Sequence, residues 1–267
     1  MHTLTRAIDL TYNPRITGAG CISPGRLDFL DLAIRPLRLW ITLCGSPAPD
    51  TGLLIDVAQI DPALHEELAQ APLPDSTPLA LLQLAADACN KRFPDFPLQR
   101  IALDLADPLQ LALIFPEDHP MIEITRTYTF AAGHRLNNPD WSDEQNQRAF
   151  GKCANPAGHG HNYTLQVTLR AKPDTGRGDS SLAVAALDQA VKSLILDRFD
   201  HKNLNVDSPE FASLNPTVEN MAVVFFDLLD GRFAPAILHR IRVWESPKTF
   251  ADYFGPHAGP LRHSEKT

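Results

Sequence analysis

Alternating apolar and polar residues predict a strand in the second half of the chain. The run HNYTLQVTLR alternates from its first residue, so one side of the strand carries His161, Tyr163, Leu165, Val167 and Leu169. This pattern is typical of a half-buried antiparallel strand. We expect an earlier strand to end in TFAAGH and a later one to read HRIRVWES.

Apolar residues at helical spacing predict two helices between these strands. In AALDQAVKSLILDRF the apolar stripe consists of Leu187, Val191, Leu194 and Ile195. A second helix begins at Asn215-Pro216-Thr217, where Asn or Thr can cap the first turn and Pro is tolerated, and it ends near Gly231. Its buried stripe is formed by Met221, Phe225, Leu228 and Leu229.

The first half of the chain repeats this plan. RAIDLTYNPRI from Arg6 parallels RTYTFAAGHRL from Arg126. Three later pairs share an offset of 140 residues: Thr77 with Thr217, Arg92-Phe93 with Arg232-Phe233, and Arg100-Ile101 with Arg240-Ile241. Each half therefore predicts an α+β unit, an antiparallel four-stranded sheet with two helices on one face. We expect units at residues 1–115 and 121–255, followed by a tail at 256–267.

Composition and charge indicate which kinds of ligand and compartment to expect. The net charge is −8 and no run of Lys or Arg is present, so we expect a small-molecule ligand and no nucleic acid. Neither the start MHTLTRAIDLTYNP nor any later stretch carries the apolar run of a signal or membrane span, so we expect a soluble, cytoplasmic protein without a membrane partner. Four scattered cysteines fit a reducing compartment, and three of them are interpreted as small buried hydrophobes: Cys21, Cys44 and Cys89.

Three histidines predict a metal site. His159 and His161 begin a strand, where their i, i+2 spacing places both imidazoles on one face. His134 ends the preceding strand. An isolated His-x-His pair is often a coincidence, so His134 is needed for the prediction. Three histidines with an open fourth position are typical of catalytic zinc.

Two further features can each be interpreted as catalytic or as structural. Cys153, six residues before His159, is either a thiol ionised beside a metal or a small buried residue. Asp200 and His201 follow the first helix and either bind its last-turn carbonyls or supply a proton relay.

Glu245, in VWES, is a carboxylate inside an apolar strand and therefore needs a partner. A ring with adjacent N–H donors, such as a pterin, is one candidate, because both carboxylate oxygens can accept. An ion pair with Arg242 is the alternative.

These residues together resemble the family of 6-pyruvoyltetrahydropterin and 6-carboxytetrahydropterin synthases. The segments FAAGH, CANPAGHGHNY, DHKNLN, PTVEN and VWES occur in the family's order, and the resemblance spans about Met121 to Phe254. It implies the tunnelling fold (T-fold), in which units assemble ring-wise into β-barrels with active sites between neighbouring units.

The resemblance also implies a role for each matched residue. Zinc, one ion per chain, would be held by His134, His159 and His161. Cys153, Asp200 and His201 would form a proton-transfer triad. Glu245 would anchor the pterin ring, with Thr217 and Glu219 close to it. Mg²⁺ is a further expected companion of the substrate's triphosphate.

The implied activity is that of a carbon–oxygen lyase of tetrahydrobiopterin biosynthesis. It eliminates triphosphate from 7,8-dihydroneopterin triphosphate and rearranges the side chain by internal redox transfer. Five residues separate Cys153 from His159, which favours the pyruvoyl-forming branch. The alternatives are the 6-carboxytetrahydropterin synthase of the queuosine and deazapurine pathway and a non-catalytic zinc- and pterin-binding protein.

The first half lacks the residues of this site. Matching the two halves sets His134 against Pro14, His159 against Ala33, His161 against Arg35, Cys153 against Leu27 and Glu245 against Leu105. We therefore expect a degenerate, structural first unit and a homo-oligomer, a trimer of tandem units. An independent domain with another ligand in its vacated pocket is the alternative.

Overall fold

The computed structural model describes residues 2–10, 37–70, 78–106, 109–116, 119–173 and 184–256. The chain forms two compact units. The first comprises Met1–Ile124 with Lys172–Asp179, and the second comprises Thr125–Ala171 with Ser180–Thr267.

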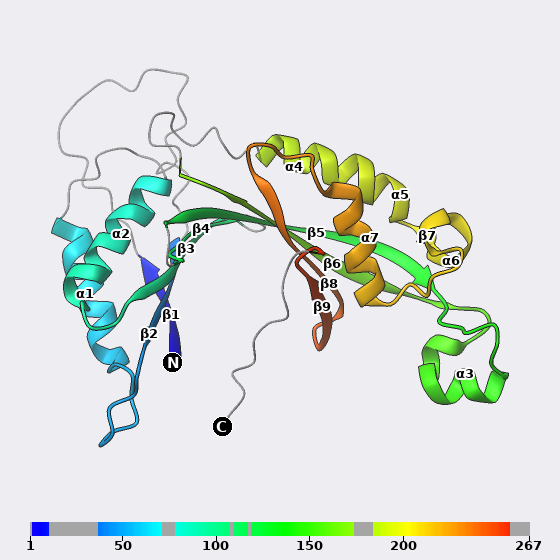
Figure 1. Ribbon diagram of the computed structural model, residues 1–267, viewed down its shortest axis with the longest axis horizontal. Coiled ribbons are helices and arrows are strands. Elements are labelled where there is room, and N and C mark those ends of the chain that lie inside the picture. The colour runs from blue at the N-terminus through cyan, green and yellow to red at the C-terminus, as the bar shows by residue number, and fades with distance from the viewer. Residues whose placement is uncertain are drawn as a thin grey trace. The chain divides into compact units, whose positions relative to one another are not determined.

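The first unit is an antiparallel sheet with two helices on one face (Figure 1). Its strands follow the chain order: β1 (His2–Leu10), β2 (Leu37–Gly45), β3 (Leu98–Ala106) and β4 (Leu109–Ile114). The helices are α1 (Val57–Gln70) and α2 (Pro78–Arg92). Alternate residues of β2 are buried, as are residues along one stripe of α2, so one core lies between sheet and helices.

The second unit contains a sheet in the order β5 (Met121–His134, of which the part from Thr125 belongs to this unit), β6 (His159–Ala171), β8 (Ile237–Ser246) and β9 (Thr249–Tyr253). A two-residue strand, β7 (Lys202–Asn203), pairs in parallel with the end of β5. Its longest helix, α7 (Val218–Leu229), packs on β8 and β9. The shorter helices are α3 (Asp143–Phe150), α4 (Val184–Val191), α5 (Asp197–Phe199) and α6 (Leu204–Asp207).

The predicted α+β fold class is confirmed, with differences in detail. The first predicted helix of the second half is present, but a π-helical segment, Lys192–Leu196, separates α4 from α5. Helices α3 and α6 and strand β7 were not predicted, because they are short or follow capping residues rather than a long apolar pattern. Strand β9 is the fourth strand of the predicted sheet, to which the sequence pattern assigned no residues. Cys44 and Cys89 are buried as predicted. Burial raises the pKa of Cys89 to about 12.

Corresponding threonine contacts recur in the two units. Thr5 Oγ1 lies 2.9 Å from Thr42 Oγ1, and Thr125 Oγ1 lies 2.9 Å from Thr168 Oγ1. The strand register shifts directly after Thr42 in the first unit and directly after Thr168 in the second. A duplicated unit predicts such matched irregularities.

Corresponding ion pairs link the first strand of each unit to its first helix. Arg6 of β1 binds Asp61 of α1 with an N–O distance of 2.6 Å, and Arg126 of β5 binds Asp188 of α4 at 2.8 Å. The predicted match between Arg6 and Arg126 is thus accompanied by a match between their partners.

Several matched positions of the first half lie outside the described residues, namely Pro14, Leu27, Ala33, Arg35 and Thr77. Cys21, interpreted as a small buried residue, also lies outside them. Leu105, the counterpart of Glu245, lies in β3 and has no side-chain ligand atom.

Candidate metal and active site

Two strand ends bring the three histidines together. His134 is the last residue of β5 and is 1% exposed, while His159 and His161 begin β6. The backbones approach closely here: a Cβ on Gly158 would lie 2.9 Å from the carbonyl oxygen of His134. Gly158 also has φ +69°, so glycine is required for both its backbone conformation and the available space.

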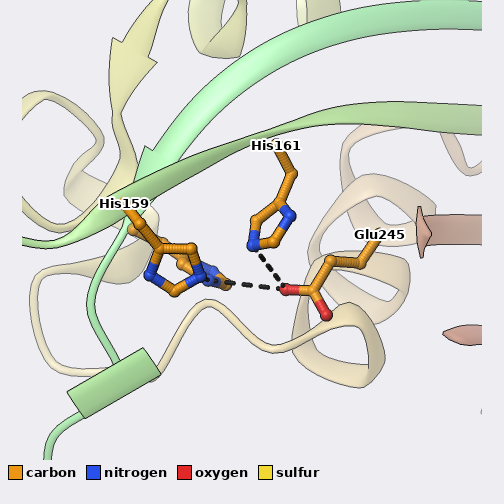
Figure 2. Close-up of side chains that lie close together, drawn as sticks. His159, His161 and Glu245 are labelled. Atoms are coloured by element: carbon orange, nitrogen blue, oxygen red, sulfur yellow. Dashed lines mark hydrogen bonds and ion pairs between the residues drawn. The ribbon is translucent and has the colours of Figure 1, made fainter. Parts of the chain in front are cut away.

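The histidine side chains form a compact cluster with Glu245, which the end of β8 supplies (Figure 2). His134 Nε2 lies 3.3 Å from His159 Nε2. Glu245 Oε1 lies 3.4 Å from His134 Nε2 and 3.3 Å from His161 Nε2. One ligand atom from each of the four residues lies within 4.8 Å of the others. The structure therefore brings together the three predicted metal ligands and the predicted pterin anchor.

Hydrogen bonds fix the proton of His134. Its Nδ1 lies 3.1 Å from the carbonyl oxygen of Pro216 and 3.1 Å from the hydroxyl of Tyr163. Because a carbonyl only accepts, Nδ1 carries the hydrogen and the lone pair of Nε2 faces the cluster. Burial lowers the pKa of His134 and also that of His161, which favours neutral imidazoles.

The donor set fits a divalent cation. His161 Nε2, which lies in the cluster, is buried and has no hydrogen-bond partner. An unpaired buried nitrogen is costly unless something binds it. Neutral imidazole nitrogens are zinc ligands, and the bond from His134 Nδ1 to a backbone carbonyl is a typical outer contact of a zinc-binding histidine.

Cys153 lies at the edge of this cluster. It belongs to a 3-10 turn, Gly151–Ala154, and its Sγ lies 3.6 Å from His159 Nε2. Burial, and secondarily the charge of Glu245, raises the pKa of the thiol. The residues of the chain alone therefore favour the neutral thiol, and a nearby cation would be needed to favour the thiolate.

Asp200 and His201 form a pair on the backbone of β5. Asp200 Oδ1 accepts a hydrogen bond from Ala131 N at 2.8 Å and lies 2.9 Å from His201 Nδ1. The bond from Ala131 is the main reason that the pKa of Asp200 is lowered. His201 has φ 58°, and its side chain is 82% exposed.

Within the described part of one chain, this pair makes no hydrogen bond or ion pair with Cys153. A shallow cavity of about 430 Å³ is lined by both His161 and His201, so His201 shares a pocket with one metal-ligand candidate.

The predicted pterin-binding residues have defined local roles. Arg242, the alternative partner of Glu245, instead binds Asp252 through two contacts of 2.6 Å. Thr217 caps α7 by accepting a hydrogen bond from Asn220 N, and Glu219 is exposed in the first turn of that helix.

Comparisons with known proteins match the second unit. The family model for 6-pyruvoyl tetrahydropterin synthase matches residues 123–256. The chain belongs to this family.

The similar proteins include members of both branches of the family. The chain is 40% identical over 139 residues to the 6-pyruvoyl tetrahydrobiopterin synthase of Drosophila melanogaster, covering 52% of this chain and 82% of the relative. It is 29% identical over 161 residues to the 6-carboxy-5,6,7,8-tetrahydropterin synthase of Aquifex aeolicus, with 49% and 96% covered. The solved structure of the Caenorhabditis elegans 6-pyruvoyl tetrahydropterin synthase has 37% identity and a TM-score of 0.48, covering 51% of this chain and 97% of that chain.

Sequence reasoning missed a group of asparagines that holds the loops around the histidine cluster. Asn205 accepts a hydrogen bond from Arg135 N at 2.7 Å and donates one to Arg135 O at 3.0 Å. Asn215 accepts a bond from Asn137 N at 2.9 Å. Asn205 is the last residue of the DHKNLN segment, so the motif contained the signal without indicating its structural use.

No helix in the described residues combines the length and apolarity needed to cross a membrane.

Proposed function

We propose that the second unit is a zinc-dependent 6-pyruvoyltetrahydropterin synthase-like lyase. It eliminates triphosphate from 7,8-dihydroneopterin triphosphate and converts the remaining side chain by internal redox transfer. The observation that carries the proposal is the Cys153 thiol 3.6 Å from His159 Nε2, at the edge of a cluster of three histidines. A metal-binding site alone needs no such thiol.

The histidines at 134, 159 and 161 would hold the zinc ion. When bound, zinc would polarise the side-chain oxygens of the substrate as a Lewis acid. The fit rests on the converging nitrogens and on His161 Nε2, which is buried in the cluster without a hydrogen-bond partner. Mg²⁺ stays an expectation that accompanies the triphosphate.

Cys153 would accept and return protons at the side-chain carbons of the substrate. Its raised pKa makes it a strong base once it is ionised, and a thiolate is favoured beside a cation. The internal redox transfer moves hydrogen within one molecule, so no external oxidant is required.

Asp200 and His201 would relay these protons. His201 is exposed, and in the described part of the chain it makes no bond to Cys153. Both observations are expected if the relay forms between the Asp200–His201 pair of one copy and the Cys153 of another. This agrees with active sites placed between neighbouring units, as the family resemblance implied.

Glu245 would bind the pterin ring through its N3–H and 2-amino group, with Thr217 and Glu219 near the ring. Its carboxylate faces the histidines rather than Arg242, so it is not neutralised by that guanidinium. A pterin presents two adjacent donors to such a carboxylate.

The pyruvoyl-forming branch is favoured over the carboxy-forming branch. The five residues between Cys153 and His159 are one reason, and the higher identity to the Drosophila relative is another.

The test is to incubate zinc-loaded protein with dihydroneopterin triphosphate and to identify the product by mass. We expect 6-pyruvoyltetrahydropterin, free triphosphate and about one zinc per chain. A carboxylated product would move the protein to the other branch. Tight pterin binding without release of triphosphate would instead support the non-catalytic alternative and contradict the proposal.

A further inference from the structure

A cavity of about 730 Å³ lies beyond the end of β5, between α3 and α6 (Figure 1). Its lining comes mainly from three segments of the second unit: residues 135–139, residues 156–158 and residues 203–215. This volume is typical of a small-molecule site. None of the three histidines of the cluster, nor Glu245, lines the cavity, so it is distinct from the candidate metal site.

The charge of this cavity is positive. Among the described residues that line it, Arg135 is the only charged one, although the whole chain has a net charge of −8. The half-buried guanidinium donates from Nε to the carbonyl oxygen of Ala154 at 3.2 Å and makes no ion pair within the described residues. An arginine has five N–H donors, so most of them are left for another acceptor.

Three asparagines add further donors to the lining. In each of them the side-chain oxygen accepts a hydrogen bond from a backbone N–H. The pairs are Asn138 with Asp140 N at 3.0 Å, Asn203 with Asn205 N at 3.1 Å, and Asn215 with Asn137 N at 2.9 Å. Because a backbone N–H only donates, it identifies the bonded atom as the oxygen and leaves the NH₂ group for another partner. In the part of the chain that the structure describes, none of these three NH₂ groups has one.

Apolar side chains form another part of the wall, namely Phe150, Phe211 and Leu214. They lower the local dielectric constant, which strengthens hydrogen bonds to a charged ligand. A guanidinium surrounded by neutral donors, with no carboxylate in the described lining, is suited to an anion. A chain of phosphates presents acceptor oxygens in many directions, whereas a single carboxylate could not contact donors from all of these segments.

We propose that this cavity binds a phosphate chain through the guanidinium of Arg135 and the NH₂ groups of the three asparagines. The inference does not rest on the proposed lyase reaction, because anion binding needs none of the residues assigned to it.

Two sources could supply this ligand. One is the triphosphate of the proposed substrate, because the cavity borders the metal site in the chain: Arg135 directly follows His134, and Gly158 directly precedes His159. The other is a separate phosphorylated molecule that binds beside the substrate.

Replacing asparagine by aspartate tests the site without removing the local bond. In Asn203→Asp, a carboxylate oxygen still accepts from Asn205 N, but the NH₂ donor is lost and a negative charge is added. Isothermal titration calorimetry of the full chain with inorganic triphosphate should show at least about tenfold weaker binding than the wild type. Asn215→Asp should give the same loss by the same reasoning, so the test does not depend on one variant.

Asn155→Asp is the matched control. Asn155 Oδ1 also accepts from a backbone N–H, that of Ala157 at 3.1 Å, but the residue is exposed and is not among the described lining residues. This variant should bind triphosphate as the wild type does. A wild type that binds no triphosphate would overturn the inference, and so would equal binding by the wild type and both cavity variants.

Removing the metal provides a second control, because triphosphate also binds zinc. The titration is repeated on protein stripped of zinc, and the affinity should be retained because the histidine cluster does not line the cavity. Binding that disappears with the metal would place the anion on the ion and overturn the inference.

Competition distinguishes the two sources of the phosphate chain. Neopterin triphosphate, the oxidised analogue of the proposed substrate, should displace inorganic triphosphate if the cavity holds the substrate's own phosphates. Simultaneous binding of both would identify a separate phosphorylated ligand, and either result supports a phosphate site when Asn203→Asp weakens binding. Displacement by unphosphorylated neopterin would place the anion in the ring site and overturn the inference. Because these measurements need no turnover, a failure of the proposed lyase reaction would leave their result unchanged.

Discussion

At the scale of single residues, the geometry of the site depends on residues whose conformation or proton position is fixed by their surroundings. His134 is held by a carbonyl that can only accept, and Gly158 occupies a position that no side chain fits. The thiol of Cys153 is the exception, since its protonation depends on what binds beside it.

Cys153→Ala separates proton transfer from metal binding. We expect the variant to keep its zinc and its fold, while turnover falls by about 10²–10⁴-fold because the proton acceptor is lost. Zinc content and rate are measured together, and His159→Ala serves as the control that should lose most of the metal and all turnover. Loss of zinc from Cys153→Ala would make the thiol a ligand and contradict its proposed role.

Gly158→Ala tests the close approach of the two strand ends. The added Cβ would lie 2.9 Å from the His134 carbonyl, so we expect a loss of about 1–3 kcal/mol of unfolding free energy and weaker zinc binding. Gly231→Ala is the matched control, because Gly231 has φ +73° but open space around it. If both substitutions lowered the unfolding free energy equally, the positive φ alone would explain the loss, and the contact with the His134 carbonyl would contribute nothing.

At the scale of secondary-structure elements, the sequence predicted what depends on local spacing. The i, i+2 pair His159 and His161 and the strand end at His134 follow from alternation, and the structure places all three together. The contact of Glu245 with them depends on the register between β6 and β8, which no local pattern encodes. The hydrogen bonds between Asn205 and Arg135 join residues 70 apart in the chain, so no local sequence pattern could predict them either.

Asn205→Ala should loosen the end of β5. It removes both hydrogen bonds to the backbone of Arg135, the neighbour of His134, so we expect a loss of about 1–2 kcal/mol in unfolding free energy and weaker zinc binding. Asn205→Asp keeps the acceptor and loses the donor, and should lie between the wild type and the alanine variant. Unchanged zinc affinity in Asn205→Ala would show that the strand end is held by other contacts.

The ion pair between Arg6 and Asp61 predicts that the free energy of unfolding of the first unit depends on pH. The Arg6 guanidinium holds the pKa of Asp61 below its usual value. A lowered pKa in the folded state stabilises the fold above the pKa of the unfolded chain, about 4, and this stabilisation is lost as the pH falls through the folded value. Asp61→Asn should therefore cost about 0.5–1 kcal/mol at pH 7, and the difference from the wild type should shrink below about pH 4.

Urea denaturation at several pH values measures this difference. Asp50→Asn, in an exposed turn without an ion pair among the described residues, is the control and should show no such trend. A cost for Asp61→Asn that stays constant down to pH 3 would contradict an electrostatic origin.

At the scale of the whole molecule, the first unit retains structural contacts and lacks, at Leu105, the counterpart of Glu245. We propose that residues 1–115 are structural and that 121–255 form the catalytic unit, so that three chains supply the six units of two stacked rings. The outer strand β9 of the second sheet would then pair with a neighbouring copy rather than remain an open edge.

Removing the first unit tests this assembly. If the first unit has the proposed structural role, a chain that starts at Met121 should aggregate or lose activity, because its removal would expose sheet edges. Light scattering and turnover are compared with those of the intact protein, which should be a trimer. A soluble, fully active shortened chain with the same subunit number would contradict the structural role of the first unit.

The π-helical segment between α4 and α5 sets the angular phase of the chain that follows it. Leu187, Val191, Ile195 and Phe199 are fully buried at intervals of four residues. In a regular α-helix of 3.6 residues per turn each such interval overshoots by about 40°, so three intervals would rotate Phe199 about 120° off the core. The wider winding of Lys192–Leu196 removes much of that drift. Phe199 stays in the core, and the next residue, Asp200, thereby reaches the backbone of Ala131. The π-helical turn thus places Asp200, a member of the proposed proton relay, against β5, the strand that ends in His134.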